Sequence, residues 1–117
     1  GAGTQRGGLG LCLEFAARED MEVILSNGVP GHRPMGCAGG QPGAAGGACL
    51  VGGSPLDGLH RLAAGSRVLV HTAGGGGLGP PSKRSRVAAM EDLRDGLVSK
   101  EASLDNYGIK AEDLGSL

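Results

Sequence analysis

The sequence predicts an α+β fold, in which a glycine-rich region of about four short β-strands precedes a C-terminal helical hairpin. Residues 1–81 hold 22 of the 25 glycines, and apolar residues alternate there at the two-residue period of a strand. Residues 82–117 hold 13 charged side chains, and apolar residues recur there at the three- and four-residue steps of a helix. We therefore divide the chain into a glycine-rich β region, 1–81, and a helical hairpin, 82–117.

Two strands are predicted from apolar residues that alternate along the first part of the chain. These residues are Leu9, Leu11, Leu13 and Phe15 in the first segment, and Met21, Val23 and Leu25 in the second. The charged residues 18–20 separate the segments, and we interpret the pair as a hairpin or meander. The turn-forming residues 27–28 and 30–31 end the second strand. Cys12 alternates with apolar neighbours, so we expect a reduced thiol in the core.

Two further apolar runs, 48–51 and 67–72, predict the third and fourth strands. A long loop rich in glycine and proline, 29–47, lies between the second and third strands. Loops of this length in a compact domain are usually functional or held by a partner. Because the chain holds only one Phe and one Tyr, we expect residues 1–81 to be weakly ordered on their own.

The helical hairpin is predicted after Pro80-Pro81. Its apolar residues at helical spacing are Val87, Met90, Leu93 and Leu97, and those expected to face inward from the second helix are Leu104 and Tyr107. Gly96 marks the end of the first helix. Ser99 is expected to cap the second, with Glu101 in its first turn and Gly108 as its left-handed stop.

Composition excludes several classes of function. No run of residues approaches the roughly 18 apolar residues of a membrane helix, and the glycines lack the three-residue period of collagen. The net charge of −1 does not suit a general binder of polyanions. The widely spaced cysteines and histidines are Cys12, Cys37 and Cys49, and His32, His60 and His71. They form no C-x-x-C pair, so we expect no zinc knuckle and a reducing, cytoplasmic location.

Residues 74–79 match the pattern G-x-G-x-x-G directly after a predicted strand. A dinucleotide site also needs a helix that opens at the glycines, whereas Pro80-Pro81 stand where that helix would run. We therefore favour a steric device for close backbone approach over a phosphate loop, and expect a positive φ within 74–77. The structural and interface candidates are Gly74, Gly75, Gly76 and Gly77.

Charged residues flank and populate the predicted first helix. We interpret the basic cluster 83–86 as a solvated helix start rather than a nucleic-acid patch, because no aromatic residues are interleaved. Glu91, Asp92 and Asp95 are interpreted as the wet face of an amphipathic helix rather than as a metal or acid–base site. We therefore assign no catalytic, cofactor-binding or metal-binding residue from these patterns.

Four blocks of residues, taken in order, carry a family resemblance. They are GAG with RGGLG at 1–3 and 6–10, the loop blocks at 26–36 and 38–44, TAGGGGLG at 72–79, and RDGLVS, EA and NYGI at 94–99, 101–102 and 106–109. This series resembles the C-terminal end of the hydantoinase B family. That family includes the B subunit of N-methylhydantoinase, the matching half of 5-oxoprolinase, and related subunits of acetone and acetophenone carboxylases. The family typically has other residues at Ser66, Ala73, Leu78 and Pro80.

The resemblance implies an ATP-dependent hydrolase of cyclic amides built from two unlike subunits. In that family an A-type subunit uses ATP to phosphorylate the amide oxygen, and a B-type subunit completes ring opening with acidic and His residues around a divalent metal. Those residues belong to an earlier part of the family sequence, so none is carried over here. The resemblance implies a C-terminal fragment with a scaffold or interface role, inactive alone. Its partners would be the rest of the B subunit and an A-type subunit, without nucleic acid or membrane.

Two alternatives stay open at the level of sequence. One is a free-standing glycine-rich binding module without catalytic activity, and the other is a small independent hydrolase that uses the scattered His and Asp residues. The substrate of a parent enzyme is also open, because the sequence does not distinguish hydantoin, oxoproline, a lactam or a ketone.

Overall fold

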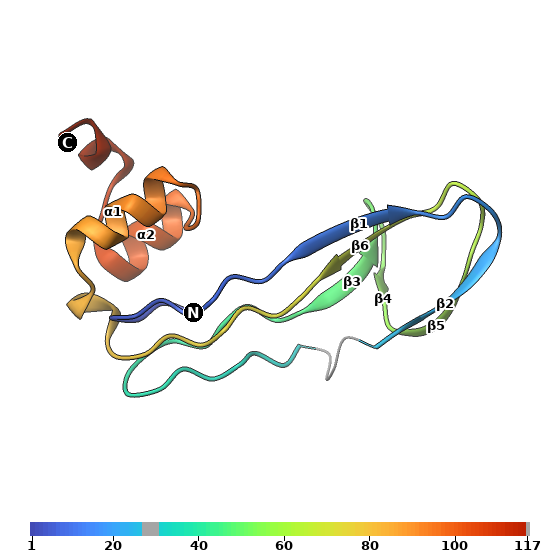
Figure 1. Cartoon of the computed structure of the whole chain (residues 1–117), viewed down its shortest axis with the longest axis horizontal. Coiled ribbons are helices and arrows are strands. Elements are labelled where there is room, and N and C mark those ends of the chain that lie inside the picture. Colours follow the sequence, from blue (N-terminus) through green and yellow to red (C-terminus); the bar gives the residue numbers. More distant parts are fainter. Residues whose placement is uncertain (27–30, 117) are drawn as a thin grey trace. The chain divides into compact units, whose positions relative to one another are not determined.

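A computed structural model describes residues 1–26 and 31–116 (Figure 1). Short antiparallel strands in two sheets precede two α-helices, which confirms the predicted α+β class. The described residues hold six strands instead of about four, because Pro55–Leu56 (β4) and Gly58–Leu62 (β5) add to the predicted set. Of the stop predicted at 27–28 and 30–31, residues 27–30 lie outside the described residues, and Gly31 lies in a turn with a left-handed φ of 74°.

The chain forms two compact units, each made from separated segments. The first unit comprises Gly1–Leu9, Met35–Gly43 and Gly75–Leu117, and the second unit comprises Gly10–Pro34 and Ala44–Gly74. This grouping differs from the predicted division into 1–81 and 82–117. The helices share a compact unit with three glycine-rich segments from the region that the sequence assigns to strands.

The second unit contains both sheets. One sheet has the order β1-β6-β3-β4, and the other pairs β2 with β5, with every pair antiparallel. The remaining strand bounds are β1 Cys12–Ala16, β2 Met21–Leu25, β3 Gly47–Leu50 and β6 Arg67–His71. The four apolar runs of the sequence therefore all become strands.

The predicted pairing of the first two strands is wrong, because β1 pairs with β6 and β2 pairs with β5. The backbone of Ala17 explains the switch. Its N–H donates to Ser66 O at 2.8 Å and its carbonyl accepts from Gly65 N at 2.7 Å, so the turn before β6 holds the end of β1. The Asp20 carboxylate then accepts a hydrogen bond from Ala64 N at 2.9 Å, next to the start of β2. These contacts direct the chain into the second sheet.

The core of the second unit is small. Its buried residues are Ala17, Ala48, Leu56, Leu62 and Val68, with Phe15, Val23, Leu25, Leu50 and Val70 packed against them. Only the end of the alternating row on β1 reaches this core: Phe15 is half-buried, whereas Leu11 and Leu13 are exposed. Cys12 is exposed as well, so the expected core thiol is wrong. Leu11 and Leu13 therefore lie on a part of the sheet face that no core side chain covers.

The helices of the first unit begin and end close to where the sequence predicts. They are α1 Arg86–Arg94 and α2 Lys100–Tyr107, flanked by the short 3-10 helices η1 Pro81–Lys83 and η2 Ala111–Ser116. Ser99 caps α2 by accepting a hydrogen bond from Ala102 N, and Glu101 lies in its first turn. Gly96 and Gly108 have left-handed backbones, with φ of 71° and 65°. These predictions are confirmed.

A second core cluster joins the helices to the segment that follows α2. It consists of Ala89, Met90, Leu93 and Ile109, with Tyr107 packed against it. Leu104, expected to face inward, is 47% exposed, and Val87 at the start of the apolar series is 62% exposed. The inward position is taken by Ile109 after the turn at Gly108. In the described part of the chain, no helix combines the length and apolar character that crossing a membrane requires.

Candidate functional site

Three glycine-rich segments of the first unit, 1–9, 35–43 and 75–79, run side by side, and we call them the glycine bundle (Figure 1). Each segment bonds to the other two through its main chain. Gly75 N donates to Gly8 O at 2.9 Å and Gly77 N donates to Gln41 O at 2.9 Å. Gln41 N in turn donates to Ala2 O at 2.8 Å. The bundle is therefore held by hydrogen bonds between backbones rather than by packed side chains.

Several glycines of the bundle have no space for a side chain. A β-carbon on Gly76 would overlap the Met35 carbonyl, and one on Gly77 would overlap the Ala2 carbonyl. A β-carbon on Gly75 would lie 3.1 Å from Gly8 N, which is a milder conflict. Gly8 itself faces open space. Close backbone approach thus restricts particular positions rather than every glycine.

The four predicted interface candidates are divided between the units. Gly74 is buried at the end of a segment of the second unit, whereas Gly75, Gly76 and Gly77 belong to the bundle. The expected positive φ within this tract is wrong, because the left-handed glycine lies further on, at Gly79 with φ 73°. No residue in 74–77 has a left-handed backbone. Glycine is needed in this tract because it lacks a β-carbon.

The phosphate-loop alternative for residues 74–79 conflicts with the hydrogen bonding. A phosphate loop needs backbone N–H groups that point at the ligand. Five N–H groups of this tract instead donate to carbonyl oxygens, and these donors are Gly74, Gly75, Gly77, Leu78 and Gly79. The tract leads into Pro80 and the three-residue η1, and α1 begins only at Arg86. These five N–H groups are therefore already hydrogen-bonded within the protein and do not point at a ligand.

A buried ion cluster joins the glycine bundle to α1 within the first unit. Arg6 of the bundle donates from Nε to Asp92 Oδ2 at 3.0 Å and from Nη2 to Oδ1 at 3.2 Å. Arg84 donates from Nη2 to the same Oδ2 at 2.6 Å. The side chains of Asp92, Arg84 and Arg6 are only 9, 10 and 20% exposed. Asp92 thus lies between two arginines rather than on the wet face of α1, which corrects the sequence interpretation.

The electrostatics of the cluster favour an ionised carboxylate. Burial raises the pKa of Asp92, but the hydrogen bonds and positive charges of Arg6 and Arg84 outweigh it and lower that pKa below 3.8. Arg84 also donates to Thr4 O at 3.3 Å, and its guanidinium lies 5.8 Å from the centre of the Tyr107 ring. Arg84 therefore touches the bundle, α1 and α2, and is not a solvated residue of the helix start.

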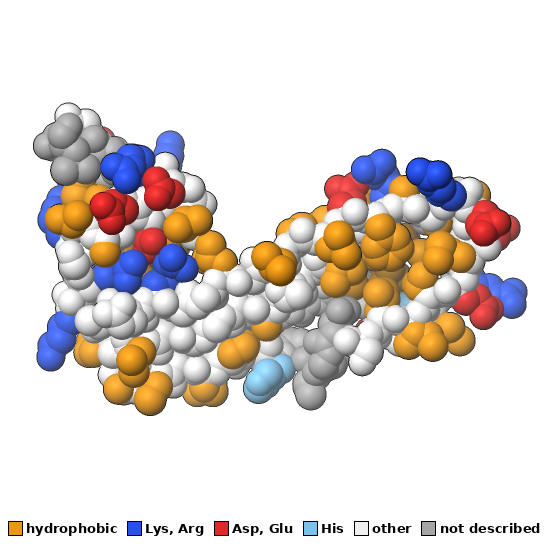
Figure 2. All heavy atoms as spheres, in the orientation of Figure 1, with side chains coloured by type: hydrophobic (Ala, Val, Ile, Leu, Met, Phe, Trp, Pro, Cys, Tyr) orange, Lys and Arg blue, Asp and Glu red, His pale blue; other side chains and the backbone are white. Residues whose placement is uncertain are grey.

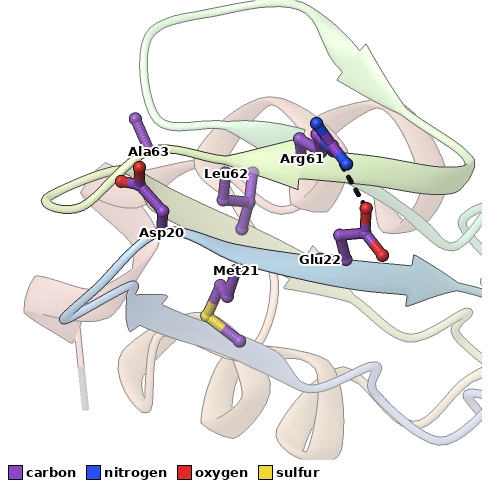
Figure 3. A pocket seen from close by; sticks show the side chains of 6 residues that line it. All are labelled: Asp20, Met21, Glu22, Arg61, Leu62 and Ala63. Carbon is purple, nitrogen blue, oxygen red and sulfur yellow. Dashed lines mark hydrogen bonds and ion pairs between the residues drawn. The ribbon is translucent and has the colours of Figure 1, made fainter.

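A shallow hollow of about 510 Å³ lies in the second unit, at the start of β2 and the end of β5 (Figure 3). Its charged side chains form ion pairs or hydrogen bonds within the protein. Figure 3 shows Arg61 and Glu22 pointing toward one another, and their ion pair measures 2.9 Å. Asp20 accepts the hydrogen bond from Ala64 N. With these groups paired, the hollow offers no evident catalytic constellation.

The remaining chemically reactive side chains are dispersed. Cys12 and Cys37 are exposed and Cys49 is half-buried, and they belong to different segments of the chain. His60 of β5 has its Nε2 2.7 Å from the carbonyl oxygen of Asp57, just before that strand, while His32 and His71 are exposed. Across residues 1–26 and 31–116, no three His, Cys, Asp or Glu residues gather as metal ligands would. The described donor set therefore does not fit a divalent metal.

The first unit is therefore a bundle of glycine-rich backbones that is joined to a small helical cluster by buried charges. The model of the Hydantoinase B/oxoprolinase family matches residues 1–81, which include all three segments of the bundle. The chain belongs to the Hydantoinase B/oxoprolinase family, as its motifs predict. This family is associated with hydrolases that act on cyclic amides.

A curated relative is similar along nearly the whole chain. The uncharacterized protein MJ0963 of Methanocaldococcus jannaschii is 32% identical over 116 residues, which cover 94% of this chain and 20% of that protein. The chain thus spans about a fifth of the length of this relative. No solved structure matches the chain significantly.

Proposed function

We propose that the chain is the C-terminal structural and interface portion of a hydantoinase B-type subunit, in an ATP-dependent hydrolase of cyclic amides. The observation that carries the proposal is the family match over residues 1–81, the region that contributes every segment of the glycine bundle. A bundle of this kind positions backbone closely and rigidly without supplying a reactive side chain. It suits a scaffold better than a catalytic centre.

The chemistry of the proposed enzyme would reside outside this chain. An A-type subunit would use ATP to activate the amide oxygen, and other parts of the B-type subunit would hold the divalent metal and complete ring opening. The residues described here do not fit the metal, so no step of the reaction is derived from them. The partners in this proposal are the rest of the B-type subunit and the A-type subunit, in the cytoplasm.

Gly75, Gly76 and Gly77 are proposed as the positions on which this scaffold role depends. Gly76 and Gly77 lie against carbonyl groups of other bundle segments, so a side chain at either position would separate the segments. Gly74 is buried and donates to Ala44 O at 3.0 Å, so it fixes the start of the tract. Any interface formed by the tract would present main-chain atoms in a fixed geometry.

The proposal is tested in a chimera, in which this chain replaces the matching segment of a hydantoinase B-type subunit. The chimera is combined with its A-type subunit, and ATP-dependent ring opening of hydantoin and of 5-oxoproline is measured. We expect hydrolysis by the chimera and none after deletion of the segment. We expect Gly76→Val to abolish assembly and hydrolysis, whereas Gly8→Ala, at a position facing open space, preserves both.

The isolated chain is the negative control in the same experiment. We expect neither phosphate release above a blank without protein nor saturable ATP binding by calorimetry. Phosphate release that disappears in His71→Ala would identify an independent hydrolase and contradict the proposal. Unchanged hydrolysis after deletion of the segment would contradict the scaffold role.

A further inference from the structure

The core face of the four-stranded sheet continues beyond its cover. One row of residues runs across all four strands, through Leu56, Ala48, Val70 and Leu13. Leu56 and Ala48 are buried and Val70 is half-buried, but Leu13 is 62% exposed. Leu11, which lies on the same face two residues before Leu13 in the chain, is 74% exposed. Burial therefore declines steadily toward β1, although every residue of the row is apolar.

The second sheet covers only part of this face. Val23, Leu25 and Leu62, from β2 and β5, pack into the same cluster as Val68. Leu11 and Leu13 are not part of that cluster. Figure 2 shows hydrophobic side chains gathered at the surface over β1 and the strands beside it. Burying one leucine side chain fully contributes at least roughly as much free energy as burying two methylene groups. A partner that covers Leu11 and Leu13 would therefore be stabilised by burial of both side chains.

β1 is also an edge strand, because it pairs only with β6 among the described residues. Thr72 N donates to Leu11 O, and Ala17 N donates to Ser66 O. In an antiparallel pair the residues alternate between facing the partner and facing away. The backbone groups of Leu13 and Phe15 therefore face β6, and those of Cys12, Glu14 and Ala16 lie along the open edge.

We propose that the open edge of β1 binds an extended segment from the rest of a B-type polypeptide. This inference rests on the proposed function. The segment would pair with the backbone groups of Cys12, Glu14 and Ala16, and its alternate apolar side chains would cover Leu11 and Leu13. Pairing thus extends the sheet by one strand and continues the apolar row, which is the physical basis of recognition by strand addition.

Two observations select the rest of the polypeptide over a second copy of this chain. The chain corresponds to about a fifth of its curated relative, so four-fifths of such a protein is available to supply the strand. Glu14 occupies the centre of the five-residue β1. Its carboxylate already pairs with Arg67 of the same sheet. Two copies of β1 paired antiparallel about that centre would place one Glu14 opposite the other, with no further cation from either β1 to separate the like charges.

Amide exchange at the outward positions of β1 tests the proposal. In the isolated chain, we expect Cys12, Glu14 and Ala16 to exchange rapidly. In the chimera used to test the proposed function, we expect their exchange to slow by at least about tenfold, without the A-type subunit. Equally rapid exchange in the chimera would overturn the proposal. So would slowing that needs the A-type subunit, or slowing in the isolated chain that rises with its concentration, which would indicate a second copy.

A charge substitution with a matched control localises the surface. We expect Leu13→Lys to lower the melting temperature of the chimera but not of the isolated chain. Ile24→Lys, at a 77% exposed position on the other face of the β2–β5 pair, should lower neither. An equal loss in both variants of the chimera would overturn the assignment to β1.

Two further measurements keep the outcome decisive. If the chimera does not fold, exchange is measured in the whole M. jannaschii relative, at the residues aligned with Cys12 and Glu14. Rapid exchange there overturns the proposal, and slow exchange supports it. Ring opening by a chimera whose β1 edge still exchanges rapidly would refute strand addition while leaving the proposed function intact.

Discussion

The glycine bundle of the first unit and the two sheets of the second unit are stabilised in opposite ways. In the glycine bundle, separate segments approach so closely that the main chains bond directly and a β-carbon would separate them. In the two sheets of the second unit, a small set of apolar side chains fills the space between backbones. Adding an atom therefore damages the glycine bundle, and removing one damages the sheets. This contrast predicts which substitutions each unit tolerates.

The largest effect is expected for an added methyl group inside the bundle. Gly76→Ala would force the segment away from Met35 O and lower the free energy of unfolding by about 3 kcal/mol or more. Gly75→Ala should cost less, because its nearest neighbour is Gly8 N at 3.1 Å. Gly8→Ala is the control, and should be neutral or slightly stabilising since its β-carbon meets open space.

Urea unfolding, combined with amide exchange, measures this series. The order Gly76 above Gly75 above Gly8 is the diagnostic result, and the loss of exchange protection should begin in the first unit. Equal effects at Gly76 and Gly8 would show that glycine acts there through chain entropy rather than through close approach.

A smaller loss is expected from the charge that fastens the bundle to α1. Asp92→Asn leaves Arg6 and Arg84 without their shared carboxylate, and should lower the free energy of unfolding by about 2–3 kcal/mol. The matched control is Asp95→Asn, because Asp95 pairs with Arg94 in an exposed position and should cost about 0.5 kcal/mol or less. Chemical denaturation of both variants provides the comparison. A loss for Asp95→Asn as large as that for Asp92→Asn would contradict a special role for burial.

The second unit is tested by removing atoms. Val68 is fully buried at the centre of the sheet cluster, so Val68→Ala should lower the free energy of unfolding by about 1.5–2 kcal/mol. Val51→Ala is the control, because Val51 is half exposed in the turn after β3 and should change stability by about 0.5 kcal/mol or less. Exchange protection should fall first in β3 and β6. If it fell first in the glycine bundle, the two units would not be energetically separate.

Local signals in the sequence predicted the elements well. Alternation identified the strands that became β1 and β2, and apolar runs identified β3 and β6. Ser99 and Gly108 marked the ends of α2. These features depend on a few adjacent residues. β5 was missed because its sequence, GLHRL, places a histidine and an arginine within an otherwise short apolar pattern. β4 was missed because it has two residues and begins with proline.

Features that depend on distant residues were not predicted. Arg6 binds Asp92 across 86 positions of the chain, so the helical pattern alone placed Asp92 on the wet face. The partners that crowd Gly76 and Gly77 belong to two other segments. A glycine tract indicates that space is short but not which backbone fills it. The scaffold role of the tract, for the same reason, stays a proposal.

The smallest effect is expected from acid, and it again distinguishes the units. Because the pKa of Asp92 is lowered in the folded chain, its stabilising contribution is complete above the ordinary value of 3.8. That contribution is lost as the pH falls through the lowered pKa, so the first unit should lose stability in acid. Glu101, which is exposed, and Asp113, which is half-buried, also have lowered pKa values, each chiefly through a backbone hydrogen bond, so they add to the same trend.

Asp92→Asn separates the effect of the Asp92 carboxyl from that of Glu101 and Asp113. The variant lacks the titrating group but keeps Glu101 and Asp113, so its stability should fall less than that of the unmodified chain between about pH 6 and about pH 3. Urea unfolding of both proteins across this range, followed by helical circular dichroism, measures the difference. Parallel pH profiles would mean that Asp92 does not change its ionisation on folding. A steeper fall in the stability of the variant would have the opposite sign to that required by a lowered pKa. It would contradict the assignment of Arg6, Arg84 and Asp92 as the ion cluster that joins the bundle to α1.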